Sequence, residues 1–174
     1  MACAWRMGVV HIAAAFTLAI GCGGNAQAPN APAASGEVVN FAFRSLDDKP
    51  ADGDSYRGKP LTIAFFSTGD LSSQAQTNFL VAMAAHDAGK VGYLLVAMEP
   101  PSQRELIELY RQSLKVTFAV AIADERTLAG ESKFGLIARL PTVVVLDGSG
   151  KIAMRVDGRV VSAKELREVL SEMK

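Results

Sequence analysis

The fold is decided by Leu61-Thr-Ile-Ala-Phe-Phe66 and by the helical pattern that follows it, from Ser73 to about Ala88. The first run is short and almost wholly apolar, which is typical of a strand buried on both faces of a sheet. The second begins with the spacing Ser73-x-x-Gln76, which predicts a capping box that satisfies backbone donors of the first helical turn. A buried strand that leads into a helix is the repeating unit of α/β folds.

The same alternation continues toward the C-terminus. Short apolar runs predict further strands at residues 91–98, 118–122, 142–146 and 151–156, the last two joined by a hairpin turn at 147–150. Helical patterns occupy residues 102–114 and 125–134, and a last helix opens at Ser162 with Glu165 three residues on. Ser102-x-x-Glu105 again has the capping-box spacing. We therefore expect one α/β domain over residues 37–174, with a mixed central β-sheet flanked by helices.

Composition limits the function. The 174 residues include 18 Lys plus Arg and 18 Asp plus Glu, and 49% of them are hydrophobic. The hydrophobic fraction is sufficient for the core of one domain. The equal numbers of basic and acidic residues leave no basic stripe, so no nucleic-acid partner is expected. Cys3 and Cys22 are the only two cysteines. They cannot build an internal disulfide framework or a metal site of several thiols, and we expect no metal and no cofactor.

The first 21 residues have the pattern of a lipoprotein signal peptide. Arg6 precedes a mostly apolar run, residues 7–20, which is shorter than the roughly 20 residues that span a bilayer. Leu18-Ala-Ile-Gly-Cys22 resembles a bacterial lipobox, whose cysteine is lipidated and becomes the mature N-terminus. We expect Cys22 to carry the lipid. The alternative is cleavage after Ala26-Gln-Ala28, in which case Cys22 leaves with the discarded peptide.

Residues 22–36 then comprise the lipidated Cys22 and a flexible linker. From Gly23 to Ser35 the chain has no charge and no bulky apolar side chain, so it cannot bury enough surface to offset its ordering entropy. Gly23-Gly24 places no acidic residue directly after the cysteine. By resemblance to lipoproteins of two-membrane bacteria, this implies a lipid anchor in the outer membrane and a domain that faces the periplasm of the cell envelope.

Ordered motifs run through the whole domain. They are Phe41-x-Phe43-x-x-Leu46-Asp47-Asp48-Lys49-Pro50, Tyr56-Arg57-Gly58-Lys59-Pro60-Leu61, Phe65-Phe66-Ser67-Thr68, Phe134-Gly135-Leu136, Leu140-Pro141-Thr142 and Asp147-Gly148-x-Gly150-Lys151-Ile152. In this order and spacing they resemble the membrane-associated, TlpA-like thioredoxin-fold proteins and their redoxin relatives. The resemblance covers residues 37–174 and implies a thioredoxin-like fold.

The chemistry of that family resides in a Trp-Cys-x-x-Cys segment between the first long strand and its helix. There a cysteine at the helix N-terminus gains thiolate character, attacks a disulfide and is released by its partner cysteine. In this sequence Gly69 takes the Trp position, and Asp70, Leu71, Ser72 and Ser73 take the four positions of the Cys-x-x-Cys motif. Neither a carboxylate nor an unactivated hydroxyl can exchange disulfides. The resemblance therefore implies a degenerate site, and we assign no catalytic residue.

Two interpretations of these polar residues remain open. Asp70 can cap the helix, because a carboxylate there accepts backbone hydrogen bonds and interacts favourably with the helix dipole. Alternatively, Thr68 and the residues at the former cysteine positions form a polar cluster that faces Leu140-Pro141. Pro141 matches the cis-proline position at which thioredoxin-fold proteins hold extended peptides, although it can equally serve only to fix the turn.

Three classes of function follow. The first is a redox-inactive binding or accessory domain, anchored in the envelope, whose partner is another envelope protein or a peptide. The second is the parent activity, thiol-disulfide oxidoreductase, with thiols supplied by a partner. The third, a different enzyme built around Asp70, has no motif in its favour. Copper binding and peroxide reduction, known in relatives, need cysteines that this segment lacks.

Overall fold

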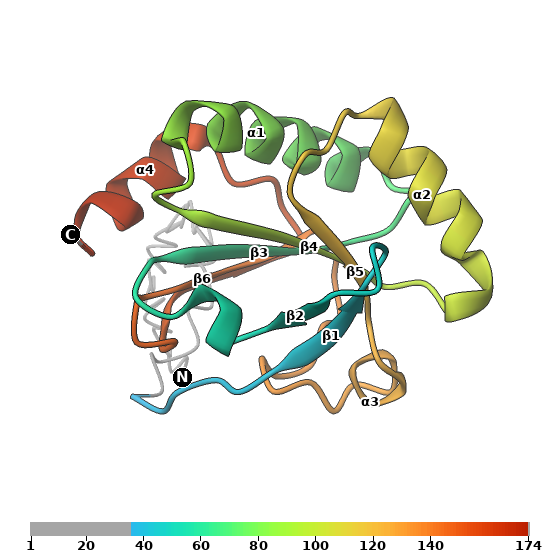
Figure 1. Ribbon diagram of the computed structural model, residues 1–174, viewed down its shortest axis with the longest axis horizontal. Coiled ribbons are helices and arrows are strands. Elements are labelled where there is room, and N and C mark those ends of the chain that lie inside the picture. The colour runs from blue at the N-terminus through green and yellow to red at the C-terminus, as the bar shows by residue number, and fades with distance from the viewer. Residues whose placement is uncertain (1–35, 174) are drawn as a thin grey trace, which may run out of the picture.

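A mixed sheet of seven strands, in the order β2-β1-β5-β4-β3-β6-β7, forms the centre of the protein (Figure 1). The computed structural model describes residues 36–173. The predicted signal peptide, Cys22 and nearly all of the predicted linker lie outside these residues. Across the described part of the chain, none of the helices combines the length and the apolar character needed to traverse a bilayer.

The elements follow the predicted alternation. The strands are β1 (Ala42–Ser45), β2 (Pro50–Asp52), β3 (Leu61–Phe66), β4 (Gly92–Ala97), β5 (Ala119–Ile122), β6 (Thr142–Leu146) and β7 (Ile152–Asp157). The helices are α1 (Leu71–Asp87), α2 (Arg104–Ser113), α3 (Glu125–Leu128) and α4 (Ala163–Ser171), with short 3-10 turns η1 (Asp54–Tyr56) and η2 (Pro101–Gln103). Strands β3, β4 and β5 are parallel, whereas β6 is antiparallel to β3 and β7, and β1 to β2 and β5. The prediction of a mixed sheet is confirmed.

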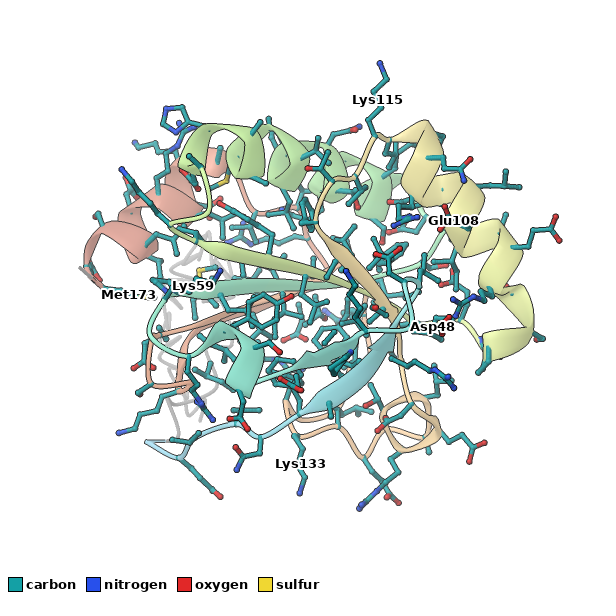
Figure 2. All side chains as sticks on the ribbon, in the orientation of Figure 1. Asp48, Lys59, Glu108, Lys115, Lys133 and Met173 are labelled. Carbon is teal, nitrogen blue, oxygen red and sulfur yellow. The ribbon has the colours of Figure 1, made fainter. Side chains whose placement is uncertain are left out.

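The sheet separates two hydrophobic cores. Along β3 the side chains alternate, so that Ala64 and Phe66 belong to one core and Ile63 and Phe65 to the other. The first core is completed by side chains of α1, α2 and α4, the second by the segment before β1 and by Phe134. Figure 1 shows α1 and α4 above the sheet and α3 below it, and Figure 2 shows side chains filling both layers. Burial on both faces explains why the central strands have continuous apolar sequences.

Two of the three predicted capping boxes are not present in the structure. Helix α1 begins at Leu71 with Asp70 as its N-cap, so the expected box between Ser73 and Gln76 is wrong. The box between Ser102 and Glu105 is also wrong, because residues 101–103 form η2 and the N-cap of α2, Gln103, makes no side-chain hydrogen bond. In α4 the reciprocal bonds of Ser162 and Glu165 are both present, as expected.

The helix expected over residues 125–134 is much shorter than predicted. Helix α3 ends at Leu128, and the chain then passes through Gly130 and Gly135, which have φ angles of 89° and 85° and interrupt any continuous helix. Arg155 holds the loop in this shape, because its guanidinium donates to the carbonyl oxygens of Phe134 and Leu136 and pairs with Asp157. The loop carries the chain across the sheet to the start of β6.

Candidate functional site

The candidate site lies where β3 and β4 end and β6 begins. The last paired residues of the parallel strands are Phe66 and Ala97, so residues 67–70 and residues 98–100 leave the sheet together. Strand β6 runs the other way, and Thr142 pairs with Phe65. This register brings Pro141 alongside the Phe66–Ser67 end of β3. Lys59, labelled in Figure 2, precedes β3 and marks the opposite end of the sheet.

Asp70 caps helix α1, which confirms one of the two interpretations of this residue. Its carboxylate accepts hydrogen bonds from the backbone N–H of Ser72 at 3.3 Å and of Ser73 at 2.7 Å, and from the Ser73 hydroxyl at 2.7 Å. The hydroxyl bond contributes most to holding the pKa of Asp70 below its ordinary value, and the backbone bonds add to it against a smaller effect of burial. Asp70 is therefore a carboxylate at neutral pH.

The four positions of the degenerate motif divide into inner and outer pairs. Ser73 is fully buried, and its hydroxyl also accepts the backbone N–H of Ser67 at 3.3 Å. Leu71, by contrast, is 80% exposed, and Ser72 is exposed as well. Ser73 and the half-buried Asp70 fix the turn, while Leu71 and Ser72 are exposed beside it.

Glu99 is the residue of the site that sequence reasoning missed. It follows β4 and is only 7% exposed, yet one carboxylate oxygen accepts three hydrogen bonds. The donors are the Ser67 hydroxyl at 2.9 Å, the Thr68 backbone N–H at 2.6 Å and the Thr68 hydroxyl at 3.0 Å. Within residues 36–173 its other oxygen, Oε2, has no hydrogen-bond partner. An acidic residue directly after a buried parallel strand was the available signal, because such strands deliver their following residues to one edge of the sheet.

Asp70 and Glu99 thus belong to one hydrogen-bonded network. The Ser73 hydroxyl links Asp70 to the backbone of Ser67, and the Ser67 hydroxyl continues the path to Glu99. Thr68, predicted as a peptide-binding residue, lies inside this network and directs its hydroxyl at Glu99. The network contains carboxylates, hydroxyls and backbone groups and no sulfur, so it can accept and relay hydrogen bonds but has no redox couple.

Behind the network lies a second layer of buried polar side chains. The Tyr110 hydroxyl and the Thr77 hydroxyl are 2.9 Å apart, and the Tyr110 ring stacks on Phe66 with centroids 4.8 Å apart. Burial raises the pKa of Tyr110, and the charges of Glu99 and Asp70 act in the same direction. The side-chain amide of Gln76 forms two bonds with the backbone of Val161, accepting at 2.6 Å and donating at 3.3 Å. These hydrogen bonds connect the beginning of α1 to α2 and to the segment before α4.

The turn at Leu140 and Pro141 contains a cis peptide bond. The Thr142 hydroxyl donates to the Arg139 carbonyl at 2.6 Å, and the Pro141 carbonyl accepts the backbone N–H of Gly158 at 2.9 Å. Between these anchored groups, Leu140 forms no backbone-to-backbone hydrogen bond with the rest of residues 36–173. Its N–H and C=O remain available at the edge of the site.

Metal chemistry finds no support in the described part of the chain, where no group of three or more His, Cys, Asp and Glu residues could hold an ion. Cys22, the predicted lipid attachment site, lies outside the described residues. Since Cys3 and Cys22 are the only cysteines, residues 36–173 contain no thiol.

Solved structures with this fold are numerous. A secreted disulfide oxidoreductase of Mycobacterium tuberculosis is 18% identical with a TM-score of 0.64, and the match covers 77% of this chain and 96% of that one. A thiol:disulfide interchange protein of Chlorobium tepidum is 20% identical with a TM-score of 0.66, over 78% of this chain and 94% of that chain. A secreted thiol-disulfide isomerase of Corynebacterium glutamicum is 14% identical with a TM-score of 0.67, over 79% and 84% respectively.

These matches define the class to which the fold belongs. The protein has a thioredoxin-like fold, as the sequence motifs predicted, and it shares that fold with thiol-disulfide oxidoreductases. No protein-family model matches the sequence, and no curated protein sequence is significantly similar to it. At these identities the likeness is one of architecture, so function must be argued from the site.

Proposed function

We propose that this protein is a lipoprotein of the bacterial cell envelope whose thioredoxin-like domain binds another envelope protein or an extended peptide and performs no disulfide exchange of its own. The observation that carries the proposal is the hydrogen-bonded cap formed by Asp70 and Ser73 at the start of α1. These are the positions at which the TlpA-like resemblance implies two cysteines. Neither a carboxylate nor a hydroxyl contains the sulfur that a mixed disulfide requires.

The binding surface comprises the turn at Thr68–Ser73 and the neighbouring Leu140–Pro141. Leu140 offers an unpaired backbone N–H and C=O, which an extended chain can bond in the manner of an added strand. Leu71, 80% exposed, supplies an apolar contact next to this edge. An exposed leucine beside free backbone groups is better suited to recognition than to a reaction.

The location is supported by the signal sequence, the lipobox around Cys22 and the uncharged linker that follows. The matched proteins of Mycobacterium tuberculosis and Corynebacterium glutamicum are secreted, in keeping with a domain that works outside the cytoplasm. A periplasm-facing, outer-membrane position is the finer part of this proposal and rests on the absence of an acidic residue after Cys22.

A second candidate function is thiol-disulfide exchange with thiols supplied by a partner. The specific observation in its favour is the shared fold with proteins described as thiol-disulfide oxidoreductases. In that case the Leu140–Pro141 turn would hold the partner while the partner's own cysteines reacted.

Crosslinking in intact cells tests the binding proposal. A photo-crosslinking residue at Leu71 should capture a specific envelope protein, whereas the same residue at Lys90, exposed at the opposite end of the sheet, should not. Equal capture from both positions would contradict the assignment of the surface. In parallel, the purified protein with dithiothreitol should reduce no disulfide substrate above the uncatalysed rate. Catalysis by the wild-type protein would favour the second candidate.

A further inference from the structure

The site contains two carboxylates that no cation of the described chain neutralises. All hydrogen bonds to Asp70 and Glu99 come from serine and threonine hydroxyls or from backbone N–H groups. Neither residue takes part in any ion pair within residues 36–173. The positive end of the α1 dipole stabilises the negative charge of Asp70, which caps that helix. The charge of Glu99 is stabilised by the three hydrogen bonds to one of its oxygens.

The second oxygen of Glu99 makes this arrangement unusual. Over residues 36–173, only Glu99 Oε2 and Thr62 Oγ1 are buried side-chain polar atoms without a hydrogen-bond partner. Buried acceptors are normally satisfied, and an unsatisfied oxygen on a carboxylate is costlier than one on a hydroxyl. Glu99 is held against the Ser67–Thr68 turn by its first oxygen, so the unpaired atom lies in the site itself. Such an atom can accept a hydrogen bond from a donor outside the chain once the side chains that cover it move.

From this geometry we infer that the site recognises a basic side chain, an arginine or a lysine, on the bound polypeptide, with Glu99 as its acceptor and Asp70 as the second negative charge. The inference rests on the proposed binding function and specifies its partner. A guanidinium or ammonium group bonded to Oε2 forms a charge-assisted hydrogen bond and removes the unpaired acceptor. Two carboxylates in one hydrogen-bonded network disfavour an anion, although a helix N-terminus alone would attract one.

The surroundings fit the shape of such a side chain. A methyl group placed on Gly69 would meet no atom within 4 Å other than those of its two chain neighbours, and Gly69 is exposed, so the turn is open on this side. Leu71 next to it can cover the aliphatic stem of an arginine or lysine whose charged end reaches the carboxylates. Because Oε2 is itself covered, we expect the half-buried Thr68 side chain to move when the cation binds.

The test compares two peptide libraries bound to the full-length protein in detergent. In one, random heptapeptides carry a fixed central arginine; in the other, citrulline, which has nearly the same shape without the charge, takes that position. The arginine library should bind at least about tenfold more tightly at low salt, and the difference should shrink as salt is added. Glu99→Gln and Asp70→Asn should each lose most of this preference. Asn is also a good N-cap, so Asp70→Asn preserves the helix start.

Glu172→Gln is the matched control, because it removes one negative charge from an exposed position near the C-terminus of α4. It should bind like the wild type. Equal binding of the two libraries overturns the inference but leaves peptide binding intact. Binding of neither library contradicts both the inference and the proposed function. If Glu99→Gln fails to fold, the Asp70→Asn variant and the salt dependence decide the question. A preference for the arginine library that is reduced neither by Asp70→Asn nor by added salt overturns the inference.

Discussion

Asp70 is the residue on which both stability and recognition depend. Replacing Asp70 with alanine removes three hydrogen bonds at the start of α1, and we expect the free energy of unfolding to fall by about 0.5–2 kcal/mol. Ser73→Ala removes one of these bonds and the bond to Ser67, and we expect it to lower the free energy of unfolding by a similar amount. Asp70→Asn, which can still cap, should cost much less. Chemical denaturation of the variants measures these differences.

The pH dependence of the Asp70 contribution has a definite sign. Its pKa in the folded protein lies below the ordinary value of 3.8, so the unfolded chain binds the proton more readily. The stabilisation is therefore fully present above about pH 4 and is lost as the pH falls through the folded-state pKa. The stability difference between the wild type and Asp70→Asn should shrink on acidification below that point. A difference that stays constant down to strongly acidic pH would contradict the cap's charge as its source.

Gln76 provides a second prediction at the scale of one residue. Its buried amide forms both hydrogen bonds to Val161, so Gln76→Ala leaves a backbone N–H and C=O unpaired in the core. We expect a loss of about 1–3 kcal/mol in the free energy of unfolding, apart from any effect of the cavity. Gln74→Ala, on the exposed side of the same helix, is the control and should change little. Equal effects at the two positions would refute a structural role for the amide.

At the scale of elements, helix α1 still has the position and direction that would activate a thiol. Its N-terminus follows β3, next to the Leu140–Pro141 turn. Once Asp70 is replaced, the backbone N–H groups that it capped and the helix dipole would lower the pKa of a cysteine there. The double variant Asp70→Cys/Ser73→Cys should therefore form a disulfide and gain at least weak reductase activity with dithiothreitol. A turbidity assay of disulfide reduction, with the wild type as the inactive control, measures the gain.

A double variant that folds and forms its disulfide but stays inert would show that the two thiols are not enough. Gly69 would then be the next residue to change, because it stands where the TlpA-like resemblance implies a Trp.

The elements also show which parts of the structure a single sequence can reveal. Strands β3 to β6 are buried on both faces, so their apolar runs are continuous and were predicted to within about two residues. Strands β1 and β2 are short, with exposed residues between buried ones, and were recognised only as motifs. The loop after α3 has a helical pattern but is held open by Arg155, a partner distant in sequence. A local sequence pattern cannot predict a contact between residues that are far apart in the chain.

The same distinction applies to the site. The cap by Asp70 involves residues two and three positions away, so it could be inferred from the local sequence. The bonds from Ser67 and Thr68 to Glu99 join residues about thirty positions apart, and only the pairing of β3 with β4 brings them together. Glu99 was missed for this reason.

At the scale of the whole molecule, location is the property to test. If Cys22 is lipidated, Cys22→Ala should leave the precursor uncleaved or move the protein from the membrane fraction to the soluble one. Fractionation and mass spectrometry of the N-terminal peptide distinguish these results. A Cys22→Ala protein that is processed and membrane-bound like the wild type would refute the lipid anchor at Cys22.

The absence of sulfur from the end of helix α1 bears on how the domain behaves in changing surroundings. A pair of cysteines at this place would alternate between dithiol and disulfide as oxidants and reductants came and went. The carboxylate of Asp70 and the hydroxyl of Ser73 undergo no such change, and peroxide or glutathione leaves them unmodified. We therefore expect Asp70 and Ser73 to keep the same charge and the same hydrogen bonds in oxidising and in reducing surroundings. The start of α1 is then expected to be insensitive to the oxidants and reductants that act on thiols.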